Sequence, residues 1–346
     1  MKKSILKKIL FMFFAAAMIL GACTKKDGRT APPAENAADN ETDQKADMSQ
    51  HGDSALNAES GESGVIYVHR APLYQENQDG KMKWSAEASL GDIAVYLGEK
   101  KEAQRATDGQ KRTFFHINLK GKEYWIQDYC YEPGTVAAFV AAQDTVLYKS
   151  DSFTAATDEI IPQYFIVAVY KNSMPAGNEK FVKIATYCPE LVTSWLVKDK
   201  FIKRESLELD KLNTEAMILA QIAMESRNDT IRAELFQNAI ELNSAYSDDI
   251  AALQNLAEII IQEEEFLKTI KTEKVDQKVV ARVDVELLSI PVAGKSRFLG
   301  MLKADTVAVA SKKTVLDEDE NQVVWYYIQN KQKKGWVNAE DLRDIP

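Results

Sequence analysis

The sequence predicts a mixed, mainly β protein in which three small β-barrels follow a disordered tether and three helices are inserted between the second and third barrels. Three observations predict this fold class. A hairpin pattern that ends at a tryptophan occurs three times, apolar residues recur at helical spacing only within 205–272, and residues 24–63 lack the side chains of a core. The expected boundaries of the folded units are 64–134, 135–204, 205–272 and 273–346.

The first 22 residues have the pattern of an export signal. Four lysines are followed by an uncharged run over 9–22, which is too short to span a bilayer comfortably. The run ends in Leu20-Gly21-Ala22-Cys23, which resembles the bacterial lipobox. Resemblance to bacterial lipoproteins implies that 1–22 is removed and that Cys23 is acylated. It also implies a location in the cell envelope, with a lipid anchor in a bacterial membrane and the folded part outside the cytoplasm.

The segment 23–63, which follows the signal, has the composition of a flexible linker. Between Thr24 and Ser63 the only large aliphatic side chains are those of Met48 and Leu56. Such a segment cannot bury enough apolar surface to fold. We therefore expect a disordered tether with a typical end-to-end span of about 35 Å.

The three hairpins have similar spacing. Ile328 and Ile117 each precede a tryptophan by eight residues, and Ile184 precedes one by eleven. The three hairpin starts and their tryptophans are Phe114–Ile117 with Trp125, Phe181–Ile184 with Trp195, and Trp325–Ile328 with Trp336. A short strand lies 51, 47 and 48 residues before the respective tryptophan, at Leu73-Tyr74, Leu147-Tyr148 and Leu287-Leu288. These intervals indicate one unit repeated three times.

The repeated unit resembles the bacterial Src-homology-3-like (SH3b) domain. The resemblance rests on an early strand, a loop, a strand near Leu90-Gly91-Asp92 or Ala304-Asp305-Thr306, and a hairpin that closes on Gly-Trp-Val. The third copy matches best, whereas the first has Tyr124 and the second has Ser194 in place of the glycine. Another small β architecture is the alternative.

Apolar residues recur at helical spacing between about Glu205 and Thr272. Breaks at Asn228-Asp229 and Ser247-Asp248-Asp249 divide the segment into three helices, because short polar side chains cap helix starts. A single tetratricopeptide-like unit and a plain helical bundle remain open as interpretations. The segment is acidic, and the alternatives for that charge are a docking surface and a solvated face.

The sequence contains few residues arranged for catalysis. Bacterial SH3-like modules often accompany cell-wall hydrolases, but Cys130 and His116 lack the surroundings of a cysteine nucleophile and base. Metal-ligand and phosphate-loop motifs are missing, so we expect neither a metal nor a cofactor. A net charge of -9 argues against nucleic acid as a partner. Glu263-Glu264-Glu265 is interpreted as a solvated helical face.

Once Cys23 is lipidated, two cysteines remain. An exported protein can be oxidised, so a Cys130–Cys188 disulfide that ties the first two barrels together is predicted. Two separate buried thiols are the alternative.

Strand alternation predicts the binding surface. If Ile328 faces the core, as the register of the SH3-like family implies, Trp325 and Tyr327 are the more exposed pair. Aromatic grooves bind extended peptides in Src-homology-3 relatives. The corresponding pairs are Phe114 with His116 and Phe181 with Lys183, and the tryptophans that end the hairpins, Trp125, Trp195 and Trp336, are expected to be structural.

These patterns predict a non-catalytic envelope lipoprotein that binds a peptide-like ligand, either a cell-wall peptide or a partner protein. The second hypothesis is an assembly scaffold that docks partners on the acidic helices. A cell-wall hydrolase of unrecognised type is a more distant third.

Overall fold

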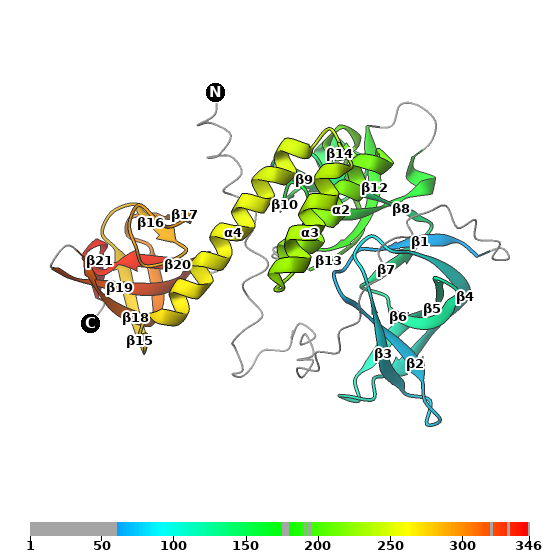
Figure 1. Cartoon of the computed structure of the whole chain (residues 1–346), viewed down its shortest axis with the longest axis horizontal. Coiled ribbons are helices and arrows are strands. Elements are labelled where there is room, and N and C mark those ends of the chain that lie inside the picture. The colour runs from blue at the N-terminus through cyan, green and yellow to red at the C-terminus, as the bar shows by residue number, and fades with distance from the viewer. Residues whose placement is uncertain are drawn as a thin grey trace.

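The computed structural model describes residues 61–174, 180–189, 191, 195–318, 321–330 and 333–344 (Figure 1). The predicted signal at 1–22, the lipidated Cys23 and the tether up to residue 60 lie outside the described residues. Ser63, predicted as the last linker residue, is instead the first residue of a strand and pairs with Val95.

The described strands form three seven-stranded antiparallel sheets, each curled on itself. Sheet 1 contains β1 (Ser63–Ile66), β2 (Ala71–Glu76), β3 (Met82–Ala88), β4 (Ile93–Gln104), β5 (Lys111–Leu119), β6 (Lys122–Gln127) and β7 (Tyr131–Pro133). Sheet 2 contains β8 (Thr135–Val140), β9 (Thr145–Tyr148), β10 (Ala156–Ile161), β11 (Ile166–Tyr170), β12 (Phe181–Tyr187), β13 (Leu196–Lys203) and β14 (Leu207–Glu208). Sheet 3 contains β15 (Glu273–Ala281), β16 (Val285–Leu288), β17 (Phe298–Leu302), β18 (Val307–Glu318), β19 (Asn321–Asn330), β20 (Lys333–Asn338) and β21 (Leu342–Asp344).

The three sheets have the same strand order. Sheet 1 runs β3-β2-β6-β5-β4-β1-β7, and the other two repeat this order with their own strands. The predicted mainly β class, with three repeated β units and three helices, is therefore confirmed at this level.

The turns that precede β4, β11 and β18 have the same backbone shape but are formed by different residues. Gly91, Tyr164 and Asp305 each donate their backbone N–H to the first strand of their sheet, at 2.8, 2.6 and 2.9 Å. All three have a left-handed φ, of 82°, 64° and 60°. This conformation suits glycine and is strained for other residues. In the second repeat Tyr164 adopts it in place of glycine, and the glycine pattern is therefore weak in that part of the sequence.

Sheets 1 and 2 pack directly on each other. Val65 and Tyr67 of sheet 1 lie in a shared buried cluster with Ala168 and Ala185 of sheet 2. Across the same interface, Lys198 Nζ lies 2.7 Å from Glu132 Oε2, and both side chains are largely buried. The two sheets therefore form one packed body.

Three helices follow β14 and precede β15: α2 (Lys211–Glu225), α3 (Asp229–Glu241) and α4 (Ser247–Thr269). Asn228 caps α3 through its side-chain oxygen, which accepts a hydrogen bond from the backbone N–H of Ile231 at 3.1 Å. The apolar stripes of the helices form a core that also includes Phe139 and Tyr164 of sheet 2 and Leu90 of sheet 1. Within the described residues, no helix is long and apolar enough to cross a membrane.

The C-terminal half of α4 reaches sheet 3 (Figure 1). Glu263, only 5% exposed, accepts hydrogen bonds from Ser289 Oγ at 2.5 Å and from Arg297 Nε at 2.6 Å. The interpretation of Glu263 as part of a solvated face is therefore wrong, although Glu264 and Glu265 are exposed. Glu263 points toward sheet 3 because that side of α4 lies against the β16–β17 connection.

Candidate functional site

The outer face of sheet 1 carries a row of aromatic rings. Trp84 pairs with Tyr74, Tyr74 with Trp125, and Trp125 with His116, so the row crosses β3, β2, β6 and β5. Directly paired residues of an antiparallel sheet point to the same face. The neighbours Leu73, Ile117 and Ile126 point into the core of sheet 1 instead. We call Trp84, Tyr74, Trp125 and His116 the aromatic row.

The corresponding positions of the other sheets hold different residues. In sheet 2 they are Ala156, Tyr148, Phe201 and Lys183. In sheet 3 they are Phe298, Leu288, Trp336 and Tyr327. The first sheet is thus the only one of the three with an aromatic ring at all four positions.

This register corrects the assignment of Trp195. The residue of sheet 2 that matches Trp125 and Trp336 is Phe201, because Phe201 pairs with both Tyr148 and Lys183. Trp195 lies just before β13 and is 37% exposed, so its predicted structural role is wrong. In sheet 2 the partners Lys183 and Phe201 are further apart in the sequence than the partners His116 and Trp125 of sheet 1. Trp125 and Trp336 are buried, in agreement with their predicted structural role.

His116 and Trp125 form one half of the row, with His116 at its end. Their rings stack with centroids 4.5 Å apart and planes 11° apart. Lys101 Nζ lies 4.2 Å from the centroid of the Trp125 ring, a cation–π contact. His116 is partly exposed and has two carboxylates nearby, those of Glu99 at 3.7 Å and Glu123 at 3.4 Å. This part of the row therefore joins flat apolar surface to charges of both signs.

Trp84 forms the exposed end of the row. Its side chain is 46% exposed, whereas Tyr74 is 1% and Trp125 is 7% exposed. An exposed aromatic ring is a candidate anchor for a ligand, and Trp84 and His116 provide one such ring at each end of the row. Trp84 could not be singled out from the residue pattern, because its place in the row follows from the pairing of β2 with β3.

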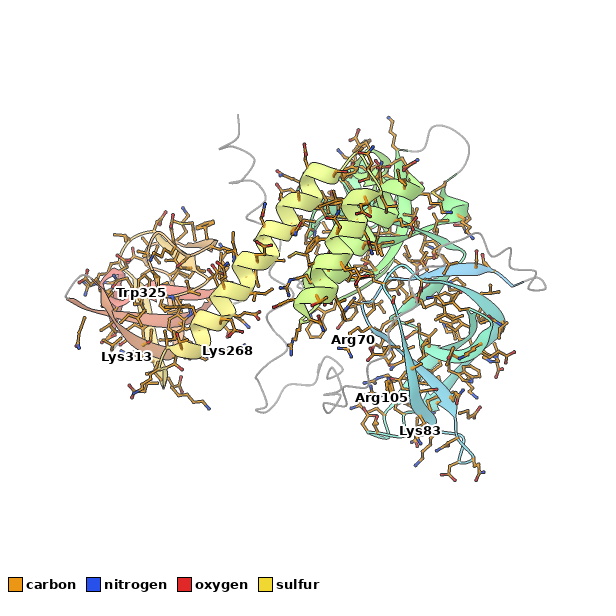
Figure 2. The ribbon with its side chains drawn as sticks, viewed as in Figure 1. Arg70, Lys83, Arg105, Lys268, Lys313 and Trp325 are labelled. Atoms are coloured by element: carbon orange, nitrogen blue, oxygen red, sulfur yellow. The ribbon has the colours of Figure 1, made fainter. Side chains whose placement is uncertain are left out.

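Two of the four residues predicted to bind ligand are buried. Phe114 is fully buried against Tyr74, at 5.3 Å with an edge-to-face geometry, together with Met82 and Ala103. Trp325, labelled on sheet 3 in Figure 2, is 3% exposed. Its cross-strand partner Thr314 donates a hydrogen bond to the carbonyl of Lys271, so the segment after α4 covers this face.

The other two predicted residues are partly exposed. Tyr327 lies 5.4 Å from Trp336 and has Lys312 Nζ at 5.7 Å from its ring. His116 belongs to the aromatic row. The structure therefore separates the predicted pairs, keeping His116 and Tyr327 accessible and placing Phe114 and Trp325 in packing positions.

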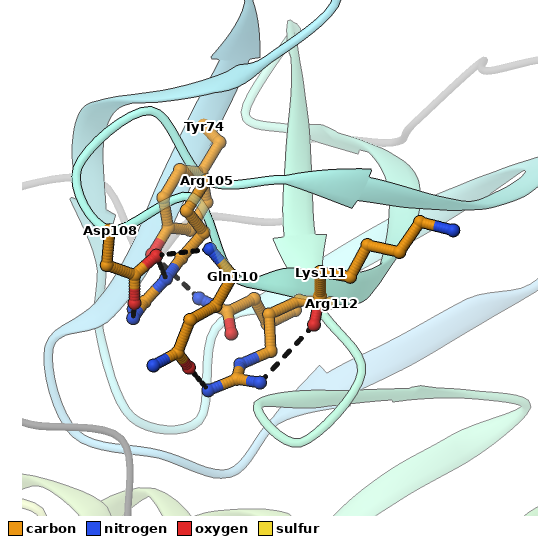
Figure 3. Close-up of polar contacts among 7 residues, drawn as sticks. Tyr74, Arg105, Asp108, Gln110, Lys111 and Arg112 are labelled. Carbon is orange, nitrogen blue, oxygen red and sulfur yellow. Dashed lines mark hydrogen bonds and ion pairs between the residues drawn. The ribbon is translucent and has the colours of Figure 1, made fainter.

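A buried polar network supports the row from below Tyr74 (Figure 3). Gln127 Nε2 donates a hydrogen bond to the Tyr74 hydroxyl at 2.7 Å. Arg105 hydrogen bonds to Tyr74 and to Asp108, with Arg105 Nε at 3.2 Å from Asp108 Oδ1. Although burial opposes it, these hydrogen bonds raise the pKa of Arg105, while the guanidinium lowers the pKa of Asp108. Arg105 is therefore a fixed cation beside the row.

The structure does not join Cys130 and Cys188 in a disulfide. Cys130 lies in the core of sheet 1 and Cys188 in the core of sheet 2. Tyr187, the residue before Cys188, faces sheet 1, and its ring is 5.5 Å from that of Tyr129. Successive residues of an extended segment point to opposite sides, which directs Cys188 away from Cys130. The alternative of two separate buried thiols is the arrangement observed.

Cys130 and His116 also do not meet. Cys130 is fully buried in the core, and burial raises the pKa of its thiol, whereas His116 lies on the outer face. Within the described residues, no group of three or more His, Cys, Asp or Glu side chains could hold a metal ion.

No protein-family model matches the chain, and no curated protein matches it. Among solved structures, the chain is similar to NlpC2 and NlpC1 from Trichomonas vaginalis, with 10% sequence identity to each. The match to NlpC2 covers 83% of this chain and 98% of that one, with a TM-score of 0.18. The match to NlpC1 covers 83% and 94%, with a TM-score of 0.17. At these TM-scores the likeness carries no inference about fold or function.

Proposed function

We propose that this chain is a non-catalytic lipoprotein of the bacterial cell envelope that binds an extended, peptide-like ligand along the aromatic row of sheet 1. The observation that carries the proposal is the row itself, four rings side by side on four strands with Trp84 and His116 accessible at its ends. In this proposal each sheet is an SH3-like barrel, and a lipid on Cys23 anchors the chain to the membrane.

The dimensions of the row suit a short peptide. Four neighbouring strands spaced by about 4.8 Å place its outer residues roughly 14 Å apart, the length of about four extended residues. Ring faces accept apolar side chains, and the polar groups beside His116 and Lys101 can pair with charged or amide groups. These features support a peptide ligand over a purely apolar one.

The proposed ligand is a cell-wall peptide, with a partner protein of the envelope as the second choice. A shallow surface of this size binds weakly, at roughly micromolar to millimolar dissociation constants. A lipid anchor would hold the row near its ligand and raise the effective concentration. Weak binding is therefore compatible with occupancy in the envelope.

Titration of a soluble cell-wall stem peptide into the full chain in detergent micelles tests the proposal. We expect saturable binding by calorimetry, and loss of about tenfold in affinity for Trp84→Ala, since an anchoring aromatic residue contributes more than about 1 kcal/mol. Trp195→Ala is the matched control, because Trp195 is a partly exposed tryptophan outside the row. Equal binding by Trp84→Ala, or cleavage of the peptide by the wild type, would contradict the proposal.

One observation favours the scaffold as an alternative function. The helices expose large apolar side chains among their acidic residues: Leu212 is 44%, Ile231 is 49% and Ile259 is 43% exposed. A scaffold would dock a partner there and not on the aromatic row. Replacing the exposed Glu234 with Lys should then abolish capture of an envelope partner, whereas Trp84→Ala should leave it unchanged.

A further inference from the structure

Arg105 is buried more deeply than any other arginine or lysine of the described residues, with 3% of its surface exposed. It lies in sheet 1, at the end of β4, against Tyr74 of the aromatic row (Figures 2 and 3). Burying a guanidinium is unfavourable unless it is paired and hydrogen bonded. The position of Arg105 therefore needs a reason beyond ordinary surface charge.

The carboxylate that pairs with Arg105 comes from its own turn. Asp108 lies three residues further on, in the turn between β4 and β5, and its side chain is 26% exposed. The turn is closed by backbone hydrogen bonds from Arg105 N to Gln110 O at 3.0 Å and from Gly109 N to Arg105 O at 2.9 Å. The ion pair thus joins no distant segments, and the Asp108 carboxylate borders on water.

Gln127 provides a second, independent observation. Its side chain is fully buried, and its Nε2 donates to Tyr74 as described above. Its Oε1 is also buried, yet it accepts no hydrogen bond from any described residue. A buried acceptor without a donor is rare in native proteins. A ligand N–H group would supply that donor.

We propose that Arg105, Tyr74 and Gln127 form a subsite for a carboxylate-bearing peptide. In the unbound protein the Asp108 carboxylate pairs with the Arg105 guanidinium, and the ligand carboxylate replaces it there. The ligand carboxylate pairs with Arg105, and an adjacent peptide N–H donates to Gln127 Oε1. One carboxylate replaces another, so the charge beside Arg105 is unchanged while Asp108 moves into water. This inference rests on the proposed function, because the remainder of the peptide lies along the aromatic row.

The test compares two probes, a cell-wall stem peptide with a free C-terminal carboxylate and the same peptide as its C-terminal amide. Each is titrated into the full chain in detergent micelles. Asp108→Asn removes the competing charge but keeps an acceptor for the backbone N–H of Gln110, which Asp108 Oδ1 now accepts at 3.0 Å. We expect this variant to bind the free acid about tenfold more tightly than wild type and the amide no more tightly, since charge-assisted pairs are the stronger ones.

Two further variants complete the test. Asp79→Asn, an exposed aspartate in the turn between β2 and β3, is the matched control and should change neither affinity. Arg105→Lys should abolish the preference for the free acid, because lysine cannot form the bidentate pair with a carboxylate that arginine forms. An Asp108→Asn variant with wild-type affinities, or an Arg105→Lys variant that keeps the preference, overturns the inference alone. Absence of binding by every form overturns the proposed function as well.

Discussion

Sheets 1 and 3 share a strand order but are attached to the helices by different chemistry. Sheet 1 meets α2 through close packing of Gly91 on Ile218 and through His69, whose Nε2 lies 3.6 Å from Glu225 Oε2. Sheet 3 meets α4 through the buried ion pair of Glu263 with Arg297. The repeated topology therefore fixes the arrangement of the strands, whereas the residues at the turns decide how each sheet is attached to the helices.

The largest effect should come from breaking the ion pair under sheet 3. Removal of one partner leaves an uncompensated buried charge, so Glu263→Ala should lower the free energy of unfolding by about 3–5 kcal/mol. Glu264→Ala, at the exposed neighbouring position, should change it by less than about 0.5 kcal/mol. Chemical denaturation followed by tryptophan emission measures both. Similar small losses in the two variants would show that Glu263 does not secure sheet 3.

The turn that precedes β4 in sheet 1 and β18 in sheet 3 holds Gly91 and Asp305 at the matching position. A Cβ on Gly91 would lie 2.5 Å from Ile218 Cδ1, and its φ of 82° is unfavourable for alanine, so Gly91→Ala should cost about 1–3 kcal/mol. Asp305 has a φ of 60°, and its ion pair with Arg343 is exposed. Asp305→Gly should therefore be neutral or stabilising by up to about 1 kcal/mol. Thermal unfolding of the two variants tests the opposite signs.

The pattern of residues predicted the repeated hairpins and the helical character of 205–272 because these depend on local periodicity. It did not predict which side chains are exposed, because exposure depends on which distant element covers a given face of a sheet. Trp325 and Phe114 alternate outward as expected, but the segment after α4 covers one and the β2–β3 arm lies over the other. The aromatic row was missed for the same reason, because Trp84 and His116 become neighbours of Tyr74 and Trp125 only through long-range pairing.

The contact between sheet 1 and α2 should also depend on pH. Burial raises the pKa of Glu225 to about 7, while burial, aided by Arg70, lowers the pKa of His69 to about 4. The stabilisation that Glu225 adds to the free energy of unfolding is fully present below its pKa in the unfolded chain, near 4.5. It is lost as the pH rises through about 7. The stabilisation that His69 adds to the free energy of unfolding is present above about pH 6.5 and is lost as the pH falls toward 4.

Glu225→Gln isolates the first of these two contributions. Because the Glu225 side chain is 46% exposed, solvent screening reduces the effect, and we expect a gain of about 1 kcal/mol at pH 8 and none at pH 4. Glu234→Gln, on the exposed side of α3, should change the free energy of unfolding by less than about 0.5 kcal/mol. Denaturation at both pH values measures the change. An equal gain at pH 4 and pH 8 would rule out titration of Glu225 as the cause.

The smallest expected effect distinguishes the exposed aromatic side chains of sheets 1 and 3. His116 stacks on Trp125 within the row, whereas Tyr327 occupies the matching position of sheet 3, where Leu288 interrupts the aromatic surface. His116→Ala should weaken stem-peptide binding about two- to tenfold, since aromatic contacts contribute about 0.5–1.5 kcal/mol beyond area burial. Tyr327→Ala should leave it unchanged if recognition requires the uninterrupted row. Calorimetric titration of the stem peptide into the two variants decides, and a loss confined to Tyr327→Ala would move the site from sheet 1 to sheet 3.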